Sequence, residues 1–156
     1  MIRVDIPGGP SLHLEHLVLD FNGTLACDGE LLPGVRQRLQ QLSESMRIHV
    51  VTADTFGHAR EQLAGVPCQL SILGPQEQAS AKLAYVQRLG AQSTACIGNG
   101  RNDTSMVEAA ALGIAVVQAE GAAARTLSAA DVVARDIGDA LDLLLQPQRL
   151  IATLRA

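Results

Sequence analysis

Three short segments of the chain place oxygen-bearing side chains directly after apolar runs. They are Asp20-Phe21-Asn22-Gly23-Thr24-Leu25, Thr52-Ala53-Asp54 and Gly98-Asn99-Gly100-Arg101-Asn102-Asp103. A carboxylate can act as a nucleophile or bind a hard cation, and hydroxyl and amide groups can bind an anionic ligand. Taken singly, each segment is equally well explained as an ordinary turn or helix cap. Their meaning therefore depends on whether the fold brings them together.

The apolar runs before these segments alternate with stretches of helical periodicity. Strands are expected at 16–20, 48–51, 69–73, 94–97, 114–117 and 131–133, and helices at 35–42, 57–63, 76–89, 104–111 and 137–145. Repeated strand-helix units with short loops predict an α/β fold, with a mostly parallel sheet flanked by helices. Two further extended runs, at 2–6 and 12–14, flank a Pro-Gly-Gly-Pro turn and predict an N-terminal hairpin.

The size and composition of the chain fit one compact domain. Its 156 residues contain no linker, repeat or low-complexity tract, so we expect a single domain over residues 1–156. Hydrophobic residues make up 47% of the sequence and aromatic residues only 2%, which is typical of a buried parallel sheet filled by aliphatic side chains. In such sheets ligands bind at the carboxyl ends of the strands, where the strand order reverses. The three polar segments lie at such ends.

Charge and cysteine content restrict the partners and the compartment. The chain has 12 basic and 16 acidic residues and no basic run, so we expect no nucleic-acid partner. Its three cysteines are far apart and odd in number, which argues against disulfides and favours a reducing cytoplasm; we expect them to be buried. The N-terminus carries acids and a turn where a signal sequence would be apolar, and no segment has the length of a membrane span. A cytoplasmic protein without a membrane partner is expected.

In order and spacing, the polar segments resemble the signature of the haloacid dehalogenase (HAD) superfamily, and within it the phosphorylation domain of P-type ATPases. The resemblance extends from about residue 16 to residue 134. The family's first motif, Asp-x-Asp-Gly-Thr-Leu in phosphatases, is matched at 20–25, and its fourth, Gly-Asp-Gly-x-Asn-Asp, at 98–103. Its second motif, a Thr or Ser that ends a strand, is matched by Thr52, and its third, a Lys that opens a helix, by Lys82. The resemblance implies a three-layer Rossmann-like fold.

The same resemblance implies a Mg2+-dependent phosphohydrolase or phosphotransferase. Asp20 would be the nucleophile that forms an aspartyl phosphate, and Thr52 and Lys82 would balance charge on the phosphoryl oxygens. The implied Mg2+ ligands, of which few are needed because Mg2+ keeps several waters, are the Asp20 carboxylate, the Asn22 main-chain carbonyl, Asn99 and Asp103. The implied contacts of the phosphorylated ligand are Gly23 and Thr24, in a turn that aims N–H groups at the phosphate, together with Ala53 and Asn102.

Two positions depart from the family pattern. Asn22 stands where family phosphatases carry the Asp that protonates the leaving group and then activates water. Because general acid-base catalysis is commonly worth about a hundredfold to ten-thousandfold, hydrolysis is expected to be slow. The second departure is Asn99, which stands where the fourth motif usually supplies an acid to Mg2+. Asp54 is ambiguous, because it either lines the pocket or caps the next helix. Two hypotheses stay open: a slow phosphatase acting through Asp20, and a non-catalytic or regulatory domain that binds a phosphorylated ligand or partner protein.

The chain has no room for the cap domain that family members usually insert after the first motif or between the second and third. The first gap accommodates only a small flap at 26–32 and one helix, and the second only one helix and one strand. An uncapped cleft cannot exclude water by itself. It therefore suits a macromolecular substrate such as a phosphoprotein, or a phosphorylated small molecule in a homo-oligomer whose neighbouring subunit covers the cleft.

Overall fold

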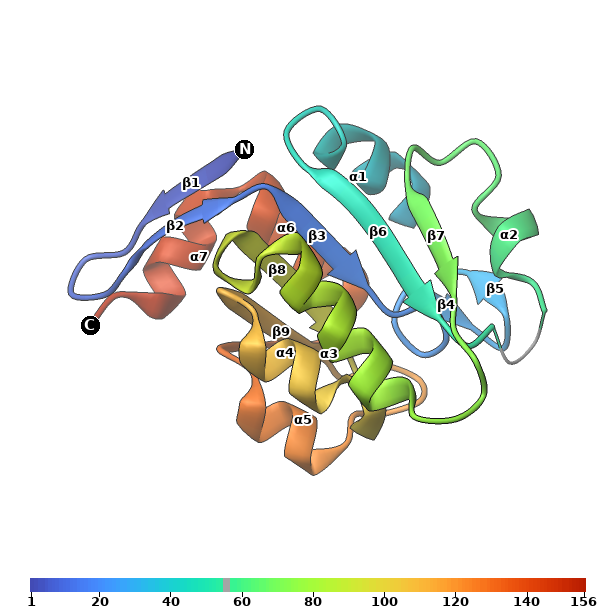
Figure 1. Cartoon of the computed structure of the whole chain (residues 1–156). Helices are drawn as coiled ribbons and strands as arrows, with labels where there is room; N and C mark the ends of the chain where they lie inside the picture. The colour runs from blue at the N-terminus through green and yellow to red at the C-terminus, as the bar shows by residue number, and fades with distance from the viewer. Residues whose placement is uncertain (55–56) are drawn as a thin grey trace.

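A six-stranded parallel sheet forms the centre of the computed structural model, which describes residues 1–54 and 57–156 (Figure 1). The strand order is β10-β9-β8-β3-β6-β7, and all five neighbouring pairs are parallel. The strands are β3 (His16–Leu19), β6 (Arg47–Thr52), β7 (Gln69–Ile72), β8 (Thr94–Gly98), β9 (Leu112–Val116) and β10 (Val132–Ala134). The predicted α/β sheet is confirmed.

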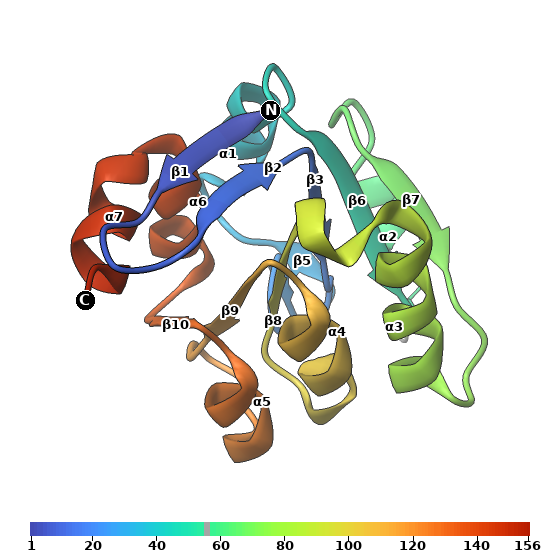
Figure 2. The ribbon, with the colours of Figure 1, turned by 60° about the vertical axis from the view of Figure 1, so that its left-hand side comes forward.

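Helices cover both faces of the sheet, which gives the expected three layers (Figure 2). On one face lie α3 (Gln78–Leu89), α4 (Thr104–Ala109) and α5 (Ala124–Ala129), together with the 3-10 turns η1 (Ala91–Ser93) and η2 (Arg101–Asp103). On the other lie α1 (Val35–Leu42), α6 (Ile137–Leu145) and α7 (Pro147–Leu154). The short helix α2 (Ala59–Gln62) lies near the edge strand β7.

The central strand β3 is buried on both sides. Leu17 and Leu19 belong to the larger hydrophobic core, and Val18 belongs to the smaller core under α3 and α4. Successive side chains of a strand point to opposite faces, so a strand covered on both faces must be apolar at every such position. This is why 17–19 is a continuous apolar run instead of an alternating pattern.

Two small hairpins accompany the sheet. The hairpin of β1 (Ile2–Asp5) and β2 (Ser11–Leu14) is antiparallel and contacts α7, which confirms the predicted N-terminal hairpin (Figure 1). The pair β4 (Ala26–Cys27) and β5 (Glu30–Leu31) forms the flap expected at 26–32. No larger insertion separates the elements in the described residues, in agreement with a fold that lacks a cap.

The observed boundaries of two elements differ from the predicted ones. The helix expected at 57–63 is reduced to one turn, α2, and the strand expected at 114–117 already begins at Leu112, because residues 112 and 113 pair with β8. A Cβ atom on Gly113 would lie 2.2 Å from the Val107 carbonyl oxygen. The glycine therefore permits the close approach of α4 to β9.

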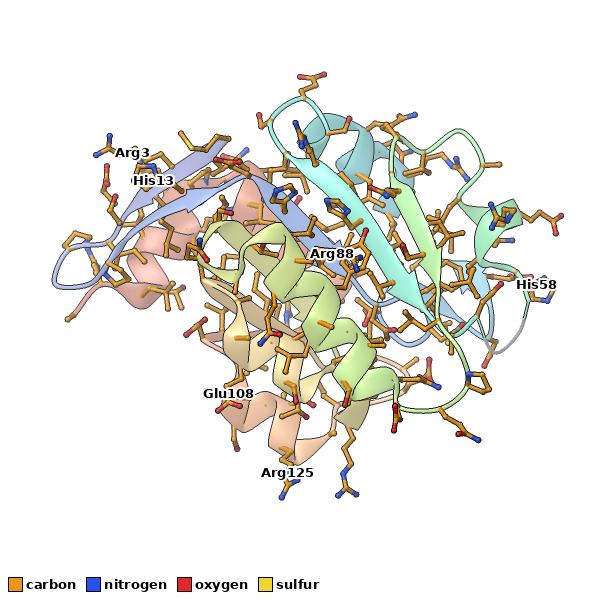
Figure 3. The ribbon with its side chains drawn as sticks, viewed as in Figure 1. Arg3, His13, His58, Arg88, Glu108 and Arg125 are labelled. Atoms are coloured by element: carbon orange, nitrogen blue, oxygen red, sulfur yellow. The ribbon has the colours of Figure 1, made fainter. Side chains whose placement is uncertain are left out.

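The outer faces of the helices are polar. Glu108 on α4 and Arg125 on α5 are exposed and point away from the sheet (Figure 3). Of the helices that the structure describes, none combines the length and the apolar character needed to cross a bilayer.

The strand order reverses at β3. The chain first extends the sheet through β6 and β7 on one side, and then returns through β8, β9 and β10 on the other. Asp20 follows β3, Thr52 ends β6 and Asn99 follows β8. The three polar segments therefore meet at the carboxyl edge of the sheet, at the position where ligands bind in open α/β sheets.

Candidate active site

A buried lysine joins two carboxylates at this edge. Lys82 is the only lysine in the chain, and it is 1% exposed. Its Nζ lies 2.8 Å from Asp20 Oδ1 and 2.7 Å from Asp103 Oδ1. Charge-assisted hydrogen bonds of this length are among the strong ones in proteins. The structure thus brings together three of the residues that the sequence placed in the site.

Helix α3 delivers the lysine from the face that it packs against the sheet. Lys82, Tyr85 and Val86 are its buried residues, at the three- and four-residue spacing that places side chains on one face. Near the carboxyl edge, the ammonium group also lies 3.5 Å from Asn102 Oδ1. Asn102 in turn donates a 2.7 Å hydrogen bond to Gln78 Oε1 at the start of the helix.

The ionisation of these groups reflects a shortage of positive charge. Burial and the neighbouring Asp103 carboxylate raise the pKa of Asp20 to about 7, although Lys82 opposes the rise. Burial lowers the pKa of Lys82, but the attraction of the two carboxylates outweighs it, so the pKa lies above its ordinary value. Both directions have one cause: two buried acids share a single cation.

Asp103 is fully engaged behind the site. Its Oδ1 contacts Lys82, and its Oδ2 accepts hydrogen bonds from the backbone N–H groups of Asn99 and Gly100, at 3.0 and 2.9 Å. The side chain is 0% exposed. A Cβ on Gly98 would lie 2.5 Å from its carboxyl carbon, so this loop needs glycine there. Asp103 fixes the loop and orients the lysine; its role as a metal ligand stays a prediction.

The loop after β3 holds Asp20 from the other side. Thr24 Oγ1 lies 3.4 Å from Asp20 Oδ2 and 3.3 Å from Asn99 Oδ1. The N–H groups of Gly23 and Thr24 bond to Ala26 O and Phe21 O within the turn, at 2.8 and 3.2 Å. The N–H groups of these two residues therefore hold the turn together, and the contact of the turn with a phosphate stays a prediction.

A cavity of about 170 Å3 opens in front of Asp20. Its walls are Asp20, Asn22, Thr52, Ala53, Gln78, Asn99, Gly100, Asn102 and Glu120. Most of the predicted site residues therefore face one space. Lys82 and Asp103 lie behind this wall, Thr24 is buried, and Gly23 lines a neighbouring cavity.

Thr52 presents a hydroxyl to the cavity, as predicted for a donor. Its Oγ1 accepts a 3.0 Å hydrogen bond from the backbone N–H of Asp54, and among the described residues no acceptor takes its hydroxyl proton, which can therefore bond to a ligand. The Asp54 carboxylate accepts from Ala59 N, the first residue of α2, at 2.9 Å. The Asp54 carboxylate thus bonds to the start of α2, as the helix-cap interpretation expects, although the residue directly before the helix is His58; Asp54 is absent from the cavity wall.

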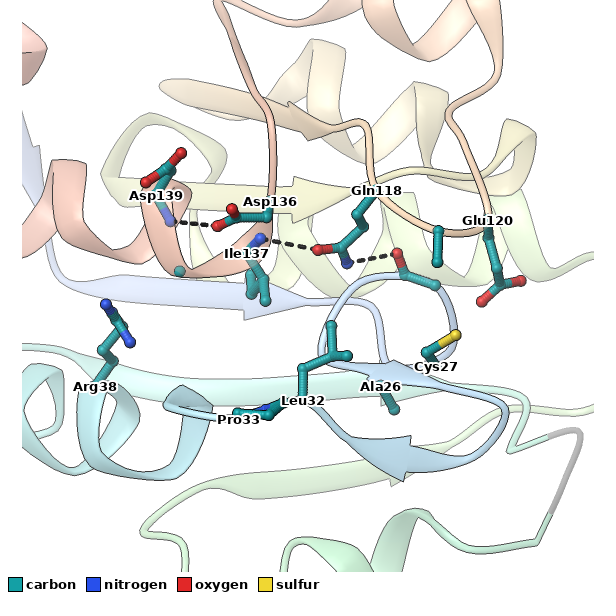
Figure 4. Close-up of a pocket in the computed structure, with 13 residues that line it drawn as sticks. Ala26, Cys27, Leu32, Pro33, Arg38, Gln118, Glu120, Asp136, Ile137 and Asp139 are labelled. Carbon is teal, nitrogen blue, oxygen red and sulfur yellow. Dashed lines mark hydrogen bonds between the residues drawn. The ribbon is translucent and has the colours of Figure 1, made fainter.

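Sequence reasoning missed two residues that follow β9. The Gln118 amide donates to Gly23 O and Thr24 O at 2.9 and 2.7 Å, and its Oε1 accepts from Ile137 N at 3.0 Å (Figure 4). It thereby links the loop after β3 to the start of α6. Glu120 lines the 170 Å3 cavity and also a larger one of about 470 Å3 between the flap and α6 (Figure 4). Applying the strand-end rule to β9 would have found both.

The oxygen atoms around the cavity suit a hard cation. Asn22 Oδ1 is buried and has no hydrogen-bond partner among the described residues, so it can accept a water or coordinate a metal. No three His, Cys, Asp or Glu side chains gather as a metal cluster in the described part of the chain. Mg2+ does not require one, because it keeps several waters and takes one or two carboxylates. The residues that fit it are Asp20, Asn22 and Asn99.

Comparison with known sequences points to the same family. The profile of the haloacid dehalogenase-like hydrolases matches residues 77–139. Uncharacterized protein MJ0073 of Methanocaldococcus jannaschii is 52% identical over 59 residues, which cover 38% of this chain and 63% of that protein. The phospholipid-transporting ATPase NEO1 of Saccharomyces cerevisiae is 28% identical over 119 residues, which cover 76% of this chain and 9% of the ATPase. The chain thus spans less than two thirds of either relative.

Among solved structures, the fold resembles that of 3-deoxy-D-manno-octulosonate 8-phosphate phosphatase from Moraxella catarrhalis, solved with magnesium, phosphate and the sugar acid. The TM-score is 0.72 at 17% sequence identity, and the match covers 92% of this chain and 94% of the phosphatase. At this identity the likeness establishes the fold. The family model over residues 77–139, the ATPase relative and the matched motifs identify the chain as a member of the haloacid dehalogenase-like superfamily.

Proposed function

We propose that this chain is a Mg2+-dependent phosphohydrolase or phosphotransferase that forms an aspartyl phosphate on Asp20. The observation that carries the proposal is the contact of Lys82 with both Asp20 and Asp103 beside the cavity. This contact holds the carboxylate at the strand end and supplies a cation next to it. With about 30 Å3 for each water, a cavity of about 170 Å3 has room for a phosphoryl group and a few waters.

The geometry favours Asp20 Oδ2 as the attacking atom. Oδ1 accepts a 2.8 Å hydrogen bond from Lys82, whereas Oδ2 makes only a long, 3.4 Å contact with Thr24 Oγ1 among the side chains described. Attack forms an Asp20 O–P bond and breaks the P–O bond to the alcohol, which leaves and takes a proton. Water then cleaves the acyl phosphate, regenerating the carboxylate and releasing phosphate. Thr52 would donate its hydroxyl proton to a phosphoryl oxygen.

A divalent cation is part of the proposal because the cavity wall is acidic. Among the residues described along this wall, only Asp20 and Glu120 are charged, and both repel a phosphate. Bound Mg2+ would screen this repulsion and polarise the phosphoryl group. The Asp20 carboxylate, the Asn22 main-chain carbonyl and the Asn99 amide oxygen would hold it, with Asp103 acting from behind through Lys82 and the loop.

The reaction is expected to be slow because of Asn22. An amide cannot protonate the leaving alcohol or activate water for the second step, so these protons must come from solvent. General acid-base catalysis is worth on the order of a hundredfold to ten-thousandfold, so turnover should lie below that of phosphatases with a carboxyl group there.

The proposal is tested by hydrolysis of an aryl phosphate with and without Mg2+. Wild type should turn over only with the metal, Asp20→Asn should be inactive, and Glu108→Gln, altered on the outer face of α4, should match wild type. Full activity in Asp20→Asn would exclude the aspartyl phosphate. Absence of turnover in wild type, together with no labelling by acetyl phosphate, would exclude the enzyme.

A second candidate function is a non-catalytic domain that binds a phosphorylated small molecule or a phosphoprotein. Two neutral amides at positions 22 and 99, where the family carries acids, favour it. The variant Asn22→Asp separates the two candidates. A gain of tenfold or more in phosphatase activity would identify Asn22 as the brake on an intact enzyme, whereas no gain and no Mg2+ binding by calorimetry would favour the binding role.

A further inference from the structure

Of the described residues that line the 170 Å3 cavity, Glu120 is the only one besides Asp20 that carries a carboxylate. Asp103, the other acid of the site, is 0% exposed, and both of its oxygens are hydrogen-bonded. A cation entering the cavity therefore meets two negative groups: one on the loop after β3 and one on the loop after β9.

The glycine at position 23 lets Glu120 come close to the candidate metal ligands. A Cβ at Gly23 would lie 2.8 Å from Glu120 Oε2, and 2.6 and 2.9 Å from the amide nitrogen and oxygen of Asn99. The acid and the amide thus converge on one point beside the nucleophile loop. With φ at +82°, Gly23 also has a backbone conformation that other residues rarely adopt.

The Glu120 side chain is exposed, and its carboxylate has no cationic partner in the part of the chain that the structure describes. Among the described residues, no Lys, Arg or His lies within 4.0 Å of it, and no donor hydrogen-bonds to it. Figure 4 shows the side chain extending from its loop beside the wall that contains Cys27. Directly next to Gly23, the buried Asn22 Oδ1 is also without a partner. Two oxygen acceptors are thus left for a cation or its waters.

We propose that Glu120 supplies the negative charge that Asn99 lacks, and that it holds Mg2+ in the cavity through the waters on the ion. This inference rests on the proposed function and adds a residue to its metal site. Contact through water follows from the absence of a three-acid cluster in the described residues and from the tendency of Mg2+ to keep its waters. Groups that orient metal-bound ligands typically change metal affinity about tenfold to a hundredfold.

The test is Mg2+ binding by titration calorimetry, with Mg2+-dependent thermal stabilisation as a second readout. We expect Glu120→Gln to raise the Kd for Mg2+ by about tenfold to a hundredfold. The control Glu108→Gln removes an equal charge from an exposed acid on the outer face of α4 and should bind like wild type. Melting without Mg2+ verifies that both variants fold.

A double variant tests whether an acid at position 99 can replace the acid at position 120. In Glu120→Gln with Asn99→Asp, the acid returns to position 99, and Mg2+ affinity should recover to within a few fold of wild type. Equal affinity of wild type and Glu120→Gln, or equal weakening by Glu108→Gln, would overturn the role of Glu120 and leave the proposed function standing. A wild-type protein that binds no Mg2+ would overturn both.

Discussion

Replacing Lys82 with Met would remove the cation between Asp20 and Asp103 while keeping a side chain of similar length. The ammonium group makes hydrogen bonds of 2.8 and 2.7 Å to carboxylates that are 7% and 0% exposed. Removing one partner of a buried ion pair costs about 3–5 kcal/mol, because the remaining charge is left uncompensated. That is a large part of the roughly 5–15 kcal/mol that stabilises a typical domain.

The loss should depend on pH in a definite direction. Burial already raises the pKa of Asp20 to about 7 in the presence of the lysine, and without it the pKa must rise further. In the variant, the native state therefore binds a proton that the unfolded state releases above about pH 4. Wild-type Asp20 releases this proton as the pH passes about 7, whereas the variant keeps it. The stability that Lys82→Met loses relative to wild type should therefore be larger at pH 8 than at pH 5, by about 1 kcal/mol.

Urea unfolding of wild type and Lys82→Met at both pH values measures these differences. The control Arg135→Met alters a side chain that is 90% exposed and should stay within about 0.5 kcal/mol of wild type. A loss below about 1 kcal/mol at pH 8, or an identical loss at pH 5, would refute the view that Lys82 neutralises two buried acids.

Three further predictions concern the core. Burial lowers the pKa of His49 to about 4, so only the unfolded state takes up its proton as pH falls below about 6.5; this contribution destabilises wild type by at most on the order of 3 kcal/mol between pH 7 and pH 4, opposite in sign to that of Asp20, and urea unfolding of His49→Gln should lack it. Gly113→Ala should lower stability by about 1–3 kcal/mol, whereas Gly74→Ala, with open space around it, should leave Tm unchanged; equal effects would contradict the packing argument. Cys96 is fully buried and the other two cysteines only partly, so a thiol reagent should titrate two thiols in the native protein and the third after denaturation; three equally fast reactions would contradict this.

The order of the elements could be predicted because each strand of the parallel sheet is a continuous apolar run. The edge at which the site lies followed from the same runs, since Asp20, Thr52 and Asn99 each come directly after or at the end of one. The cysteine prediction was too general: Cys96 is buried, but Cys27 and Cys68 are only partly so. A small apolar residue type does not reveal whether its neighbours cover it.

The partners of the polar groups could not be predicted from the sequence. The residue type at position 103 does not reveal whether the carboxylate faces the cavity or turns inward to Lys82 and two N–H groups, as the structure shows it to do. Glu120 was missed for a related reason. It belongs to no motif, and its meaning appears only when the loop after β9 is seen beside Gly23 and Asn99.

The two amides and the additional glutamate can be understood together through net charge. Asp20, Asp103 and Glu120 against Lys82 leave a net charge of -2, which a single divalent cation neutralises. Without Glu120, the metal would meet only the Asp20 carboxylate, whose charge is already partly neutralised by the ammonium group of Lys82. Such a ligand would attract a strongly hydrated cation only weakly. In the metal site that we propose, Asn22 and Asn99 are neutral, so the second negative charge comes from another part of the cavity wall, namely Glu120 on the loop after β9.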